Sequence, residues 1–302
     1  MGAQLRAVRR RISTVKSTAK ITKAQELIAS SRIIKAQQRA QAAGPYAREL
    51  TAAVEAVVSR SASINHPLTT EAPNPTRAAV LILTSDRGFA GGYNASVLRE
   101  AQGLNARLRD RGIQPVPFVS GRKGIGWHRF RNHEMAAEWS GFSDTPRHPN
   151  ATEITSALLE SFDKSAEEGG VDEIYMVYTE FVSMLTQRPV VHRVLPLEIV
   201  EQEVDQVGPI PVYEFEPSPE AVLDALLPWY VESRIFHALL DSAAAEIAAR
   251  RRAMKSATDN ANELLEALTR EANKARQAEI TQEISEIVGG ANALAETISG
   301  SK

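Results

Sequence analysis

The sequence predicts a Rossmann-like α/β domain placed between two long helices that pair with each other. Apolar residues near both ends recur in alternating steps of three and four, which is the seven-residue repeat of a coiled coil. The middle of the chain instead holds short, continuous apolar runs separated by helical stretches, which is typical of an open, mainly parallel sheet. Because one α/β domain lies between them, we expect the two helices to form an antiparallel, left-handed coiled coil.

The C-terminal helix, predicted over 219–298, is the longest element. About 80 residues at ~1.5 Å each make a helix of roughly 120 Å, whereas a compact chain of 302 residues would be about 50 Å across. We therefore expect this helix to project from the domain. Its last apolar positions alternate strictly and are Ile280, Ile284, Ile287, Ala291, Leu294 and Ile298. An upstream stripe contains one extra step of four, a predicted stutter, and consists of Ala257, Ala261, Leu264, Leu268, Ala272 and Ala275.

The N-terminal helix is predicted over 3–60. Its first apolar positions, spaced by three and four, are Leu5, Val8, Ile12, Val15 and Ala19. We expect a break or kink at Gly44-Pro45, since proline removes a hydrogen-bond donor and crowds the preceding turn. Residues 1–50 carry eleven Lys and Arg against two acids, a net charge of +9, whereas residues 219–302 carry nine against thirteen, a net charge of −4.

The central domain alternates predicted strands with predicted helices. The strands are Ala78–Thr84, Pro115–Ser120, Glu173–Phe181 and Val190–Leu195, the last of them antiparallel and at an edge. The helices are Ala95–Arg111, a stretch that opens at Gly121–Gly126, and Thr152–Glu168. The predicted division of the chain is 1–60 for the first helix, 61–76 for a Pro- and Thr-rich linker, 77–210 for the α/β domain and 211–302 for the last helix.

A glycine-rich loop over 85–94 (SDRGFAGGYN) follows the first strand, where doubly wound sheets bind phosphate. The loop has neither the GxGxxG nor the GxxxxGK[ST] spacing of a phosphate cradle. We therefore interpret Gly88, Gly91 and Gly92 as residues that permit positive φ in a tight turn, and we expect no nucleotide site.

No catalytic centre, metal site or cofactor is predicted. The chain has no cysteine, its six histidines are scattered, and neither HExxH nor GxSxG occurs. Acidic residues on the long helices are expected to face solvent. No apolar run approaches 18 residues, so we expect no membrane-spanning segment and a cytoplasmic location.

Two alternatives remain open from these patterns. One is a coiled-coil scaffold that carries an α/β ligand-binding module. The other is a basic coiled-coil nucleic-acid binder, which is less favoured because almost no aromatic residue accompanies the basic side chains.

Four segments in this order resemble the bacterial type of γ subunit of F-type ATP synthases. They are ISTVKSTAKITKAQELIA over 12–29, SDRGFAGGYN over 85–94, MKSATDNA over 254–261 and ARQAEITQEISEIVGGANA over 275–293. The resemblance implies a central-stalk rotor subunit that couples proton flow through the membrane c-ring to ATP chemistry on the β subunits, without catalysis of its own. It implies α, β, δ and ε subunits and the c-ring as partners, no nucleic acid, no direct membrane insertion, and a peripheral location on the cytoplasmic side of the cell membrane.

The resemblance also implies which residues contact partners. Residues expected against the ring of α and β subunits are Lys23, Gln25, Arg250, Arg276, Gln277, Thr281, Leu294 and Ile298. Residues expected near ε and the c-ring are Tyr213, Phe215 and Glu216.

Overall fold

The computed structural model of the protein describes residues 3–60, 72–165, 168–197, 216 and 218–299. The chain divides into two compact units. One unit combines residues 1–28 with residues 252–302, and the other comprises residues 29–251. The long helices α1 (Ala3–Arg60) and α5 (Pro219–Ser299) each contribute to both units, which are described separately below.

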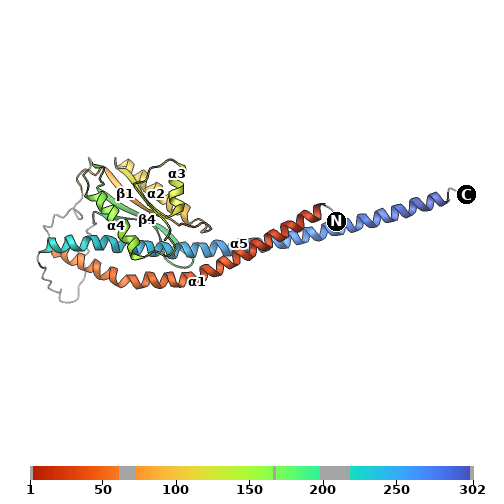
Figure 1. The fold of residues 1–302 in the computed structure, drawn as a ribbon, viewed down its shortest axis with the longest axis horizontal. Coiled ribbons are helices and arrows are strands. Elements are labelled where there is room, and N and C mark those ends of the chain that lie inside the picture. Colours follow the sequence, from red (N-terminus) through yellow and green to blue (C-terminus); the bar gives the residue numbers. More distant parts are fainter. Residues whose placement is uncertain (1–2, 61–71, 166–167, 198–215, 217, 300–302) are drawn as a thin grey trace. The chain divides into compact units, whose positions relative to one another are not determined.

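The larger unit contains a five-stranded sheet of order β3-β2-β1-β4-β5 (Figure 1). Its strands are β1 (Arg77–Leu83), β2 (Gln114–Ser120), β3 (Ala137–Trp139), β4 (Glu173–Phe181) and β5 (Gln187–Leu195). The pairs β3–β2, β2–β1 and β1–β4 are parallel, and only the edge strand β5 is antiparallel to its neighbour. The predicted open, mainly parallel sheet with long helices before and after it is therefore confirmed, including the antiparallel edge.

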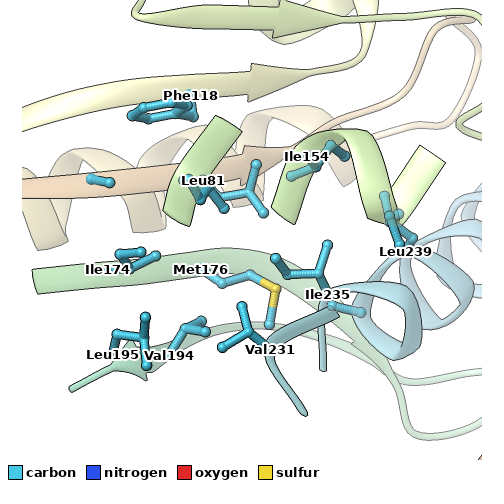
Figure 2. Packing of buried hydrophobic residues seen from close by; sticks show 14 of the residues in the cluster. Leu81, Phe118, Ile154, Ile174, Met176, Val194, Leu195, Val231, Ile235 and Leu239 are labelled. Atoms are coloured by element: carbon cyan, nitrogen blue, oxygen red, sulfur yellow. The ribbon is translucent and has the colours of Figure 1, made fainter. Parts of the chain in front are cut away.

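Three helices lie between the strands: α2 (Tyr93–Asp110), α3 (Arg122–Phe130) and α4 (His148–Asp163). Alternate residues of β1 point to opposite faces of the sheet, as the pleat requires. Val80 and Ile82 pack with α2, whereas Leu81 and Leu83 belong to the core that includes α4 and α5. Figure 2 shows this second core, in which Ile154 of α4 and Ile235 of α5 cover Leu81 and Met176. Burial on both faces explains why the apolar run in β1 is continuous.

Segments of α1 and α5 also pack together within this unit, and they run antiparallel. Val54 and Val57 share the core with Leu223 and Leu227, whereas Ser30 accepts a 2.9 Å hydrogen bond from Nε of Arg251. Because the early part of α1 meets the late part of α5, the two helix directions are opposite.

The helix α1 continues through Pro45, so the predicted break is absent. Buried residues on either side, Ala36 and Leu50, hold the helix in place despite the missing backbone donor.

The smaller unit contains the remaining parts of the two helices. Apolar residues of both are buried there, namely Leu5, Val8, Ala19, Met254, Ala261 and Leu268. Thr258 donates a 2.7 Å hydrogen bond to the hydroxyl of Thr22 at a buried position. The predicted stripe from Ala257 to Ala275 is buried or half-buried except at Leu264, which is 42% exposed, while Leu265 is half-buried instead. The positions predicted to continue it, Ile280, Ile284, Ile287 and Ala291, are exposed. With Thr258 and Leu265 in the seam, the steps to Ala275 alternate regularly, and the predicted stutter is not needed.

Candidate functional site

The apolar stripe near the end of α5 is exposed. Ile280, Ile284, Ile287 and Val288 are between 43% and 71% exposed, although they continue a helical repeat whose earlier members are buried. Exposed apolar side chains that repeat along one face typically mark an interaction site. This stretch is therefore the first candidate for partner binding among the described residues.

Three of the predicted partner residues accompany this stripe. Arg276, Gln277 and Thr281 are all exposed on α5, directly before and within the stripe. The Thr281 hydroxyl donates to the Gln277 carbonyl oxygen of the same helix at 3.0 Å, so these two lie on one face, one turn apart. On α1, Gln25 is exposed, and the ammonium of Lys23 lies 3.0 Å from the carboxylate of Glu26.

The other predicted contacts are placed less fully. Glu216 is exposed. Tyr213 and Phe215 lie outside the described residues, and so do the side chains of Leu294 and Ile298. Their predicted contacts with partners stay predictions.

The glycine-rich loop 85–94 is held by hydrogen bonds to neighbouring loops. The Asp86 carboxylate accepts from the backbone N–H groups of Gly141, Ser143 and Arg122 at 2.8, 3.0 and 3.1 Å. Ser85 is bound in turn by Asn94, whose amide oxygen lies 2.9 Å from the Ser85 backbone nitrogen. The loop therefore has a fixed conformation built on its own polar side chains.

The loop uses its glycines differently from the prediction. Gly91 has a φ of 57°, as expected, but Gly88 and Gly92 do not have positive φ. The second positive φ of the loop, 63°, belongs to Phe89, whose side chain is 80% exposed. A bulky residue in this region is uncommon, and spacing alone does not reveal it.

Arg250 lies against this loop. Its Nη2 atom is 2.6 Å from a carboxylate oxygen of Glu246, one turn earlier on α5, and 3.4 Å from each of the carbonyl oxygens of Arg87 and Gly88. Only 12% of the Arg250 side chain is exposed. Arg250 was predicted to contact a partner, and the structure shows contacts of this side chain within the chain itself.

Glu246 was missed by the sequence analysis. Acids on the long helices were expected to face solvent, but Glu246 and Glu26 are buried. Burial raises the pKa of the Glu246 carboxyl above its ordinary value, and the charge of Arg250 partly offsets this. The only available signal was the spacing of four between Glu246 and Arg250, which is equally common in exposed helical pairs.

A second set of charges joins the loop to α1. The carboxylate of Asp144, 17% exposed, lies 3.0 Å from the guanidinium of Arg32 and 3.6 Å from that of Arg87. Within the larger unit, the loop is thus bonded to side chains of both long helices.

Neither a metal cluster nor a membrane span is found in the described part of the chain. No three His, Asp or Glu side chains there converge on one point where an ion could be held. Across the described helices, no 18-residue stretch is apolar enough to cross a bilayer.

Comparison with known proteins gives one consistent result. A family model described as ATP synthase matches residues 4–294. The ATP synthase gamma chain of Acidothermus cellulolyticus is 58% identical over 98% of this chain and 99% of its own length. That of Thermobifida fusca is 57% identical over the full length of both chains.

Solved structures with low sequence identity share the fold. A chain in the rotor of the Euglena gracilis mitochondrial ATP synthase matches with a TM-score of 0.63 at 14% identity, over 93% of this chain and all of that one. A chain in the OSCP/F1/c-ring structure of the same enzyme gives a TM-score of 0.65 at 15% identity, over 97% and 95%. Because the relatives at more than half identity span the whole sequence, the chain belongs to the γ-chain family of ATP synthase.

Proposed function

We propose that this chain is the central-stalk rotor subunit of an F-type ATP synthase, which couples proton flow through the membrane c-ring to ATP synthesis or hydrolysis on the β subunits. The observation that carries the proposal is the exposed apolar stripe on α5. Ile284 and Ile287, at 56% and 71% exposed, would be costly to leave in water along a helix of 81 residues. A sleeve formed by other subunits would cover them.

The proposed mechanism is a shift in the populations of the β-subunit conformations, caused by contacts with the rotor that differ from one rotor angle to the next. A rotor that is not symmetric presents different side chains to each β subunit at each angle, and each contact favours a different β conformation. Arg276, Gln277 and Thr281 lie beside the apolar stripe and are the side chains proposed to make those contacts, with Lys23 and Gln25 on the other helix. ATP chemistry would take place on β, and this chain would be a non-catalytic subunit.

The proposed partners are the α, β, δ and ε subunits and the c-ring. Tyr213, Phe215 and Glu216 are proposed to lie near ε and the c-ring, while Leu294 and Ile298 are proposed to enter the sleeve. The chain would sit peripherally on the cytoplasmic side of the cell membrane, held there by the c-ring. We also propose that the chain is divided as predicted, into a first shaft helix over 1–60, a linker over 61–76, an α/β domain over 77–210 and a last shaft helix over 211–302.

Co-purification from the native host tests the proposal. The tagged chain should bring down α, β and ε and should itself be present in sub-equimolar amount, whereas the scaffold alternative predicts no such set. A version that ends at Gly289 should lower the yield of the complex, because it lacks the end of the helix. The thermal transition of the α/β domain should be unchanged in this version, which serves as the control for folding. Recovery of the full chain without α and β would overturn the proposal.

A further inference from the structure

The contact between α5 and the glycine-rich loop combines polar contacts of Arg250 with apolar packing. The Arg250 side chain of α5 reaches two consecutive carbonyl oxygens of the loop backbone, those of Arg87 and Gly88. Beneath it, Ala90 and Tyr93 of the loop region pack on Ala245 and Ala249 of the helix. We call Glu246, Arg250 and the two loop carbonyl groups the helix–loop clamp.

The polarity of the helix–loop clamp is opposite to that of a phosphate cradle. A phosphate loop turns its N–H groups toward an anion. Here two C=O groups face a cation, the guanidinium of Arg250, whose charge is balanced by the buried carboxylate of Glu246. The position that binds phosphate in other doubly wound sheets thus holds a side chain of the long helix.

A gain in folding stability alone does not explain the ion pair between Glu246 and Arg250. Replacing a buried ion pair with apolar residues of similar size is often neutral or stabilising, whereas removing one partner leaves the other charge uncompensated. All three contacts of Arg250 are made by Nη2, so one terminal nitrogen links the Glu246 carboxylate to both loop carbonyl oxygens. The pair therefore specifies one arrangement of helix and loop, and the small side chains of Ala245 and Ala249 let the two approach closely.

A second contact supports the same arrangement. Asp144 lies between Arg87 of the loop and Arg32 of α1, and the Asp144 carboxylate oxygen that Arg32 contacts is also the one nearest Arg87. A force on the loop in this unit is consequently resisted by bonds to α1 and α5 together.

We propose that the helix–loop clamp transmits torque between the α/β domain and α5, with Arg250 as a positioning residue that holds the loop. This inference rests on the proposed rotor function. It replaces the expectation that Arg250 acts by touching the ring of α and β subunits. When the helix–loop clamp is loosened, the domain yields under load, and less of the work of ATP hydrolysis reaches the c-ring.

The first measurement is hydrogen exchange of the full-length chain. Arg250→Met keeps much of the apolar stem and removes every donor. We expect amides of 85–94 to exchange about tenfold faster in this variant, because lost hydrogen bonds lower the free energy of local opening. Amides of β1 should be unchanged. Lys164→Met is the matched control, since it removes a basic side chain from the exposed i,i+4 pair with Glu160 in the same unit.

The second measurement is coupling in membrane vesicles at matched abundance of the complex. The ratio of ATP-driven proton pumping to ATP hydrolysis should fall at least twofold in Arg250→Met and less in Arg250→Lys, which keeps a charge and N–H donors but carries them on a flexible stem. The ratio in Lys164→Met should equal that of the wild type. A purely structural role would lower abundance and leave the ratio per complex unchanged.

The outcomes separate the two proposals. Unchanged exchange in 85–94, or faster exchange with an unchanged pumping ratio, would overturn the helix–loop clamp as a torque joint. If Arg250→Met does not assemble, the same two measurements on Arg250→Lys and Glu246→Gln decide. A wild-type chain that does not co-purify with α and β would instead refute the rotor function, while the exchange result would still describe the helix–loop contact.

Discussion

Gly121 and Thr84 approach each other so closely that no side chain fits between them. A Cβ atom on Gly121 would lie 2.2 Å from the carbonyl oxygen of Thr84, and the φ of Gly121 is 99°. The contact lies where β1 and β2 end and α3 begins, and the Thr84 hydroxyl also accepts a 2.9 Å hydrogen bond from the Gly124 N–H. Backbone and side chain together therefore require glycine at this position.

We expect Gly121→Ala to lower the free energy of unfolding of the α/β domain by about 3 kcal/mol or more, from a steric clash added to an unfavourable φ. Gly112→Ala is the control: its φ is 79°, but nothing lies within 4 Å of the added Cβ atom. It should cost only about 1 kcal/mol. Urea titration followed by tryptophan fluorescence measures both, since Trp127, Trp139 and Trp229 all belong to the larger unit. Equal costs for the two variants would contradict the expected clash.

His128 should make the same domain less stable in acid. His128 as a residue is 2% exposed, and its Nδ1 atom lies 3.0 Å from the Gly124 carbonyl oxygen. Burial lowers the pKa of His128 below its ordinary value of 6.5, and the nearby His133 and Arg131 lower it further. Below pH 6.5 the unfolded chain binds a proton that the folded chain does not, so stability falls as the pH decreases toward the lowered pKa.

The test compares His128→Leu with His133→Leu, which replaces an exposed histidine of the same region. The loss of stability between pH 7.5 and pH 5 should be smaller in His128→Leu than in the wild type. In His133→Leu it should be reduced far less, because His133 is a smaller cause of the lowered His128 pKa than burial is. A His128→Leu variant with the full acid loss would show that other groups cause it.

The titration of Glu246 should change the stability of the domain with pH in the opposite direction from that of His128. Its pKa is raised above the ordinary 4.5, chiefly by burial. Between 4.5 and the raised value, the folded carboxyl keeps a proton that the unfolded one has released, so stability falls as the pH rises through this window. Glu246→Gln removes the titrating group, and we expect its stability relative to the wild type to improve as the pH increases above 4.5.

Arg250→Met should raise the pKa of Glu246 further, because Arg250 is the main group that lowers it. The loss of stability with rising pH should therefore be larger in this variant than in the wild type. Unfolding midpoints in urea at pH 5, 6 and 7 measure the trend in both variants. A parallel pH profile for wild type, Glu246→Gln and Arg250→Met would show that this carboxyl does not control stability.

Arg276→Ala tests the contact with the ring. Arg276 is exposed beside the apolar stripe, where an ion pair shielded by other subunits would be costly to break on one side. We expect proton-driven ATP synthesis to fall several-fold, and to fall less in Arg276→Lys, which lacks the planar donor fork. The thermal transition of the free chain should not change. Wild-type synthesis rates at normal abundance of the complex would show that Arg276 is only a solvated charge.

Most of the fold was predictable because its patterns are local. The apolar run of β1 and the alternating steps of Leu5, Val8 and Ala19 follow directly from strand and helix geometry. The strand β3 was missed because its three residues, Ala137–Trp139, are too few to show a period. Leu264 was placed in the seam because only apolar residues were counted, whereas the seam continues through the polar Thr258.

The helix–loop clamp was not predictable for a different reason. Its side chains, Glu246 and Arg250, lie more than 150 residues from the loop carbonyl groups, and each alone has the sequence signal of an exposed charge. The packing of Ala90 and Tyr93 on α5, together with the hydrogen bond from the Tyr93 hydroxyl to the Ser242 carbonyl oxygen, brings the loop against the helix. Long-range burial of a charge depends on tertiary structure, which local patterns do not encode.

Because Arg250 belongs to the same chain as the loop that it contacts, its effective concentration at the loop does not depend on the concentration of the protein. A doubly wound sheet ordinarily exchanges the ligand at the end of its first strand with solution, but here the group at that place is covalently part of the same chain. An intramolecular group has an effective concentration of millimolar or more, which the fold sets and the protein concentration does not change. A dissolved guanidinium compound would need comparable concentrations to compete for the two loop carbonyl groups. The sheet therefore keeps its bound group at any dilution of the protein.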